Sequence, residues 1–89
     1  MVKPLSFSER KNLVDKYLTE ISLLAKRLCP DARVEVTTEA FEDEDGHVRI
    51  YTPAGMNEEE VAVIEGTVAD RCVDILIEEG VFICSAVYD

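Results

Sequence analysis

Residues 33–52 read RVEVTTEAFEDEDGHVRIYT, and this stretch decides the fold. From residue 33 to residue 41 the side chains alternate with period two, which is typical of a half-buried strand. One face carries Val34, Val36, Thr38 and Ala40, and the other carries Glu35, Thr37, Glu39 and Phe41. Residues 47–52 repeat the alternation, with Val48 and Ile50 on the inner face. The pattern predicts a β-hairpin.

The turn of this hairpin is expected at residues 42–46, which are four acids and a glycine. An Asp-Gly pair such as Asp45-Gly46 supplies the positive φ that a tight turn needs. The acids suggest a Ca²⁺ loop, but Phe41 and Thr52 stand where its first and twelfth ligands belong. We therefore expect a solvated acidic tip with no metal, and we place His47 at this tip.

A long helix precedes the hairpin. Ser6 and Glu9 have the spacing of a capping box, and Pro30 marks the end of the helix. Apolar residues recur at helical spacing in between. They are Val14, Tyr17, Leu18, Ile21, Leu24, Ala25 and Leu28. The sequence predicts an amphipathic helix with this stripe in the core.

A second helix is predicted over residues 58–79, with Asn57 as its N-cap and Gly80 just after its C-terminus. Its core stripe is Val61, Ile64, Val68, Cys72, Ile75 and Leu76. A second row of mostly small side chains consists of Ala62, Gly66, Ala69 and Val73. A mid-helix glycine costs about 1 kcal/mol relative to alanine, so close packing is expected there. We favour the first helix as the neighbour over a second copy of the chain.

Residues 81–88 are apolar on both faces and predict a third strand. The fold class is therefore α+β, a two-layer sandwich in the order α-β-β-α-β over the single domain 1–89. Two helices cover one face of a three-stranded mixed or antiparallel sheet. The last strand lies beside the second strand or beyond the first. In both orders it forms an edge, where an apolar strand needs a partner.

The net charge of −10 is unevenly distributed. Residues 1–33 are net basic, whereas residues 34–89 hold fifteen of the nineteen acids. An acidic domain repels phosphate backbones, so nucleic-acid binding is disfavoured. No long apolar stretch indicates a membrane partner, and no leader is evident at the start, so we expect a cytoplasmic protein.

No motif for catalysis, metal binding or a cofactor stands out in the sequence. The cysteines Cys29, Cys72 and Cys84 are odd in number and do not have zinc-site spacing, so we interpret them as small buried hydrophobes. His47 is the only histidine. A Cys–His nucleophile needs it beside Cys84 or Cys72, and its expected place at the hairpin tip argues against that pair.

The sequence leads us to expect a non-enzymatic protein-interaction or regulatory module that works as a homodimer through its last strand or a sheet face. The expected partner-binding surface mixes aromatic and charged side chains, as interfaces do. It consists of Glu35, Thr37, Glu39, Phe41, Arg49 and Tyr51. The alternative is a small enzyme or ligand-binding domain whose pocket forms at the dimer interface, near Cys84, Tyr88 and Tyr51.

Overall fold

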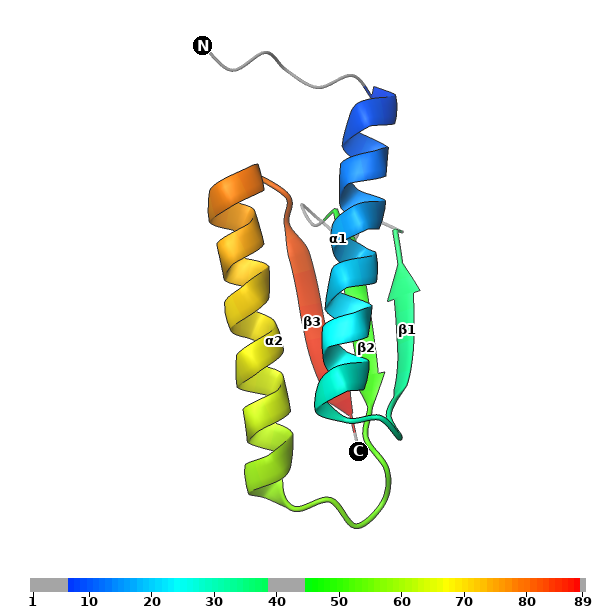
Figure 1. Cartoon of the computed structure of the whole chain (residues 1–89), viewed down its shortest axis with the longest axis vertical. Helices are drawn as coiled ribbons and strands as arrows, with labels where there is room; N and C mark the ends of the chain where they lie inside the picture. The colour runs from blue at the N-terminus through cyan, green and yellow to red at the C-terminus, as the bar shows by residue number, and fades with distance from the viewer. Residues whose placement is uncertain (1–6, 39–44, 89) are drawn as a thin grey trace.

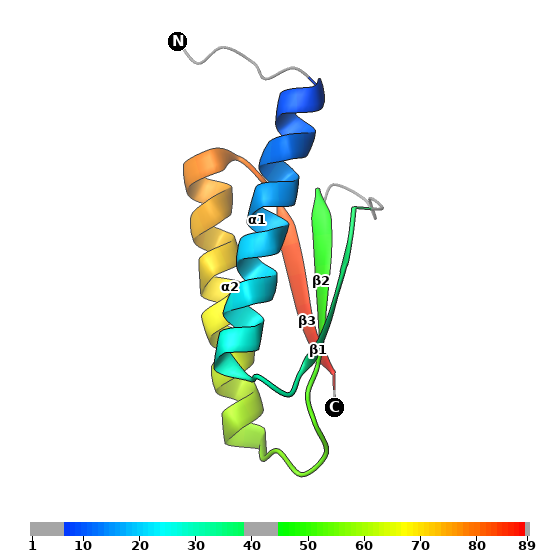
Figure 2. The same cartoon turned by 45° about the vertical axis from the view of Figure 1, so that its right-hand side comes forward.

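A computed structural model describes residues 7–38 and 45–88 of the chain. Within these residues it contains the predicted elements in the predicted order. They are α1 (Phe7–Leu28), β1 (Arg33–Thr37), β2 (Gly46–Tyr51), α2 (Glu58–Glu79) and β3 (Ile83–Tyr88). Both helices lie on one side of the sheet (Figure 1), and the described part of the chain puts no helix on the other side (Figure 2). The predicted two-layer α+β sandwich is confirmed.

The sheet is mixed, with the strand order β1-β2-β3. β1 and β2 are antiparallel, and Val36 is in register with Val48. β2 and β3 are parallel, and Val48 is in register with Ser85. The long α2 helix makes the crossover that a parallel pair requires. Of the two predicted strand orders, the structure therefore has the one with β3 beside β2, at an edge of the sheet.

The core lies between the helices and the sheet. α1 packs on β1 and β2, and α2 packs mainly on β3. The largest fully buried side chains are Ile21, Val48, Ile50, Val68, Ile75 and Val81. Their period is close to 3.6 in the helices and is two in β2, as the sequence predicts. Burial of such aliphatic side chains contributes about 1.5–3 kcal/mol each, so these few residues dominate the stability of a small domain.

The caps of α2 agree with the sequence prediction. The Asn57 side chain accepts a hydrogen bond from the backbone N–H of Glu60 at 2.8 Å and donates one to its carboxylate at 3.0 Å. Gly80 adopts the left-handed conformation, with φ of 68°, and its N–H donates to the carbonyl oxygen of Leu76. The helix ends are fixed locally, so the 22-residue helix begins and ends where the side chains predict.

The predicted turn at Asp45-Gly46 is wrong. Gly46 is the first residue of β2, and the positive-φ glycines of the described chain are Gly55 and Gly80. A Cβ at Gly46 would lie 2.9 Å from Cδ2 of Leu18. Glycine is present because α1 approaches the strand closely, a role that glycine also serves in strands. The connection between the two strands lies mostly outside the described residues.

The small-residue row of α2 does not contact α1, contrary to our favoured prediction. A Cβ at Gly66 would meet nothing within 4 Å, and Ala62, Ala69 and Val73 are exposed. α1 packs instead on the neighbouring side of α2, where Arg71 reaches Glu20. The helices are held by this polar seam, which leaves the small-residue row uncovered in a single chain.

Candidate protein-interaction surfaces

The sheet face opposite the helices carries every second residue of the three strands. Because neighbouring strands are in register, nine side chains form three rows with one residue from each strand. Written from β1 to β3, the rows are Thr37–His47–Cys84, Glu35–Arg49–Ala86 and Arg33–Tyr51–Tyr88. We call these nine residues the open face.

The structure places four of the six predicted binding residues together on the open face. They are Glu35, Thr37, Arg49 and Tyr51. Glu39 and Phe41 lie outside the described residues. The prediction omitted the β3 residues of this face because the last strand is apolar on both sides, so its pattern did not show which side chains face outward.

One row of the open face is a stack of planar groups. The guanidinium of Arg33 lies 4.4 Å from the ring centre of Tyr51, and the rings of Tyr51 and Tyr88 are 5.3 Å apart at an interplanar angle of 24°. A cation–π contact at an exposed site contributes about 0.5–1 kcal/mol. The stack orders two tyrosines of neighbouring strands against each other, so they offer a preformed aromatic group.

The open face is more basic than the rest of the molecule. It carries two arginines and one glutamate in a chain whose net charge is −10. The ion pair of Glu35 is with Arg33, at 3.7 Å. Among the described residues Arg49 forms no ion pair.

The row Thr37–His47–Cys84 contradicts the expected position of the histidine. His47 is the second residue of β2, half-buried, and its register partner in β3 is Cys84. The Nδ1 atom of His47 is buried. Side chains alternate between the two faces along each strand, so the pair could have been predicted only if the parallel register of β2 and β3 had been known.

A second candidate surface lies where α2 meets the edge of the sheet. β3 has β2 on one side and no strand on the other within the described chain. A groove of about 210 Å³ runs along the exposed side of the contact between β3 and α2. It is lined by Ala69, Cys72, Val73, Leu76, Phe82, Ile83, Cys84 and Ser85. We call this groove, with the small-residue row of α2, the edge surface.

The edge surface is apolar in its centre. Val73 is 52% exposed and Leu76 is 41% exposed, and Phe82, just before β3, is 37% exposed. The small-residue row carries no charge, although α2 contains eight acids elsewhere. Contiguous exposed apolar groups bounded by charges are typical of a protein-binding surface.

The polar seam between the helices is a structural feature. Arg71 donates two hydrogen bonds to the carboxylate of Glu20, at 2.5 and 3.0 Å, and these hold the pKa of Glu20 below its ordinary value. Burial and a hydrogen bond with Glu79 raise the pKa of the Tyr17 hydroxyl. Both groups lie in the contact between the helices, so we assign them to its cohesion.

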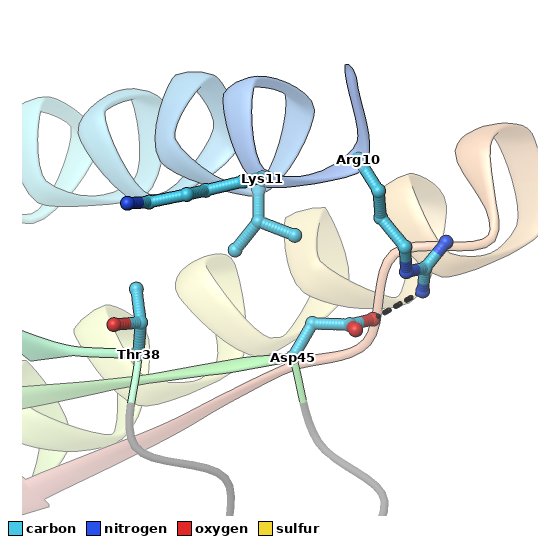
Figure 3. Close-up of a pocket in the computed structure, with 5 residues that line it drawn as sticks. Arg10, Lys11, Thr38 and Asp45 are labelled. Atoms are coloured by element: carbon cyan, nitrogen blue, oxygen red, sulfur yellow. Dashed lines mark hydrogen bonds and ion pairs between the residues drawn. The ribbon is translucent and has the colours of Figure 1, made fainter. Parts of the chain in front are cut away.

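A cleft of about 340 Å³ opens between the first part of α1 and the sheet (Figure 3). It is lined by Arg10, Lys11, Val14, Thr38 and Asp45. The side chain of Lys11 extends along the helix away from Arg10, whereas the side chain of Arg10 leaves the helix toward Asp45 (Figure 3). The two cations do not converge on one point, so the cleft lacks the geometry of an anion site.

Asp45 in this cleft acts as a clamp on the start of β3. Its carboxylate accepts hydrogen bonds from Arg10 and from the backbone N–H of Phe82, both at 2.8 Å. Its own N–H donates to the carbonyl oxygen of Phe82 at 2.7 Å. Arg10 also donates to the carbonyl oxygen of Gly80 at 3.2 Å. The clamp joins the first part of α1 to the residues just before β2 and β3 and to the residue that follows α2.

Among residues 7–38 and 45–88, no group of three or more histidine, cysteine or acidic side chains is arranged to hold a metal ion. The helices in these ranges are also too short or too polar to cross a membrane. No protein-family model matches the chain, and no curated protein or solved structure is significantly similar to it. The structure defines a small two-layer α+β protein with a mixed sheet. Its function is therefore argued from the fold and from the two exposed surfaces.

Proposed function

We propose that the protein is a protein-interaction or regulatory module that works as a homodimer, in which the edge surface joins two copies and the open face binds a protein partner. One observation carries the proposal: an apolar edge strand lies directly beside an uncharged, exposed helix row. Isolated apolar edges promote uncontrolled pairing, so proteins cover them. A second copy covers both features at once.

The helix row supports a second copy as the occupant of the edge surface. Paired strands lie about 4.8 Å apart, whereas packed helices are usually about 8–10 Å apart. α2 packs on β3, so two paired β3 strands bring two α2 helices unusually close. Ala62, Gly66 and Ala69 are small enough to allow that approach. A two-fold axis between the strands then makes the surface self-complementary.

Charge favours the same arrangement. Two copies with a net charge of −10 each repel one another, and the repulsion is smallest where the contacting surface is uncharged. The small-residue row is such a surface, and the acids of α2 lie outside it. Contact through this row keeps those acids at the solvated rim of the interface.

The proposal is tested by placing a charge in the row. Val73→Glu introduces a carboxylate at the proposed contact, and light scattering should report a monomer where the wild type is a dimer. Val63→Glu is the matched control, because Val63 is exposed on α2 but lies outside the row. The control should remain dimeric. A wild type that is monomeric at tens of micromolar, about the range of weak specific association, contradicts the proposal.

The open face is proposed as the partner surface because it combines a fixed aromatic stack with an arginine outside any ion pair in the described chain. Tyrosine and arginine are enriched where binding energy concentrates. Arg49→Glu should reduce capture of a protein partner in a cross-linking pull-down, and the exposed Leu23→Glu on α1 should not. Equal capture by both variants would remove the open face from the proposal.

A further inference from the structure

The pair His47 and Cys84 has a chemical character that the interaction surfaces do not use. The two residues are register partners in the parallel strands β2 and β3, so their side chains leave the sheet on the same face. Neighbouring strands are separated by about 4.8 Å, which places an imidazole and a thiol side by side. This is the arrangement in which a histidine activates a cysteine.

The described neighbours of Cys84 on the open face include an arginine. From β2 it faces His47, with Arg49 two residues further along the same face. From β1 come Thr37 and Glu35, each beyond a β2 residue in its row. Among the described residues of the open face, Arg49 therefore stands on the strand next to Cys84, whereas Glu35 stands one strand further away. Cations beside a cysteine stabilise the thiolate, which is the nucleophilic form.

The other two cysteines provide an internal contrast. Cys29 and Cys72 are buried, whereas Cys84 is only half-buried. Burial raises the pKa of the Cys72 thiol, and its side chain lies on the helix side of the sheet. A neutral, buried thiol is a poor nucleophile. The fold thus distinguishes one cysteine from two of ordinary structural type.

We propose that Cys84 is a reactive nucleophilic thiol, activated by His47, and that it is a site of covalent modification by small electrophiles. The imidazole takes the thiol proton and holds it as an imidazolium beside the thiolate. With iodoacetamide as the electrophile, the sulfur forms a bond to carbon and the carbon–iodine bond breaks, so that iodide leaves with its electron pair. No oxidant or reductant takes part, and the site needs only one copy of the chain.

The test measures the rate of alkylation of each cysteine by iodoacetamide across a range of pH, with the modified peptides identified by mass spectrometry. An unperturbed cysteine has a pKa of about 8.5, so only about 3% of it is thiolate at pH 7. Cys84 should react about tenfold faster than an unperturbed cysteine at pH 7, and its rate should reach half its maximum below pH 8.5. Cys29 and Cys72 should remain unmodified in the folded protein.

The variant His47→Asn separates activation from simple exposure. It should lose about the same tenfold at pH 7, with half-maximal rate moved up toward the unperturbed value. His47→Gln gives the same test if the asparagine variant does not fold, as judged by circular dichroism. The rates are measured at a protein concentration at which light scattering reports a monomer, so that a second copy does not shield the thiol.

A wild-type Cys84 that reacts no faster than an unperturbed cysteine would overturn the proposal. It would equally be overturned if the rate profile of either histidine variant matched the wild type, because exposure alone would then account for the reaction.

Discussion

At the scale of single residues, two glycines show opposite reasons for lacking a side chain. Gly46 is buried against Leu18, so packing within the chain leaves no room for a Cβ atom. Gly66 is open to solvent in one copy, so nothing within a single chain requires the absence of a Cβ atom there. Both are isolated glycines in the sequence, and their roles could be assigned correctly only when the neighbouring side chains were known.

Gly46→Ala should destabilise the monomer. The new Cβ lies 2.9 Å from Cδ2 of Leu18, a side chain that is 3% exposed and can move only by disturbing the core. Overpacking of this kind costs about 1–3 kcal/mol. The shift should appear as a lower urea midpoint with an unchanged slope. An unchanged midpoint would mean that α1 does not press on the strand.

Gly66→Ala distinguishes a solvated row from a contact between helices. On a solvated helix, alanine gains about 1 kcal/mol over glycine. In the proposed dimer the added methyl group keeps the two helices apart, so the dissociation constant should rise while the monomer becomes more stable. Sedimentation equilibrium combined with urea unfolding of the Val73→Glu monomer measures both effects. A more stable protein with undiminished dimerisation would place the contact elsewhere.

Glu20 makes the stability depend on acid pH. Its pKa is depressed in the folded state by hydrogen bonds from Arg71. A depressed carboxyl contributes stability above its unfolded pKa, and this contribution is lost as the pH falls through the lower folded value. Unfolding free energy should therefore fall below about pH 4.5, and Glu20→Gln should flatten part of that fall. An identical pH profile for the variant would contradict this origin.

At the scale of elements, the local signals predicted the helices and strands well. Helix caps and hydrophobic periodicity depend on residues that are close in the sequence, so both ends of the helix Glu58–Glu79 could be predicted to the residue. The edges of the sheet were less clear. Parallel pairing joins residues that are distant in sequence, and no local pattern indicates which of two edges a strand joins.

The open face could be predicted only in part, because local alternation is visible in the sequence whereas strand pairing is not. Glu35, Thr37, Arg49 and Tyr51 could be placed on one face because the period of two is plain in the hairpin. The alternative pocket named Cys84 with Tyr88 and Tyr51, but the pairing of Cys84 with His47 could not be predicted, because β3 is apolar on both sides and His47 was assigned to a turn. The positive-φ preference of Asp-Gly was the misleading signal, and the packing of α1 on Gly46 overrode it.

The clamp at Asp45 should control the start of β3. Asp45→Ala removes the acceptor for Arg10 and for the N–H of Phe82, and loss of a charged hydrogen-bond acceptor costs about 1–3 kcal/mol. Amide exchange at Phe82 should accelerate. Glu65→Ala, an exposed acid of α2, is the control and should leave it unchanged. Equal exchange rates in the two variants would show that the clamp is unimportant.

At the scale of the whole molecule, the directions of the backbone N–H and C=O groups of β3 determine which of them are exposed at the edge of the sheet. The carbonyl oxygens of Phe82 and Tyr88 accept hydrogen bonds from the β2 side, from Asp45 and Thr52. Because backbone groups alternate along a strand, odd-numbered residues of β3 direct their N–H groups away from β2. These outward groups would form the ladder with a second copy.

Ser85→Pro removes the central outward donor without removing a bond to β2. Proline cannot donate, and on an edge it prevents strand addition. The variant should be monomeric in light scattering. Ser85→Ala is the matched control, since it loses the hydroxyl but keeps the N–H group, and it should remain dimeric. Dimerisation of the proline variant would exclude pairing through this strand.

The proposed homodimer is tested most directly by hydrogen exchange at the backbone N–H of Ser85, followed by NMR as a function of protein concentration. If two copies pair through β3, this amide should be protected, and the protection should increase as the dimer fraction rises. Rapid exchange at every concentration, while the β2-facing amides of the same strand remain protected, would contradict the homodimer.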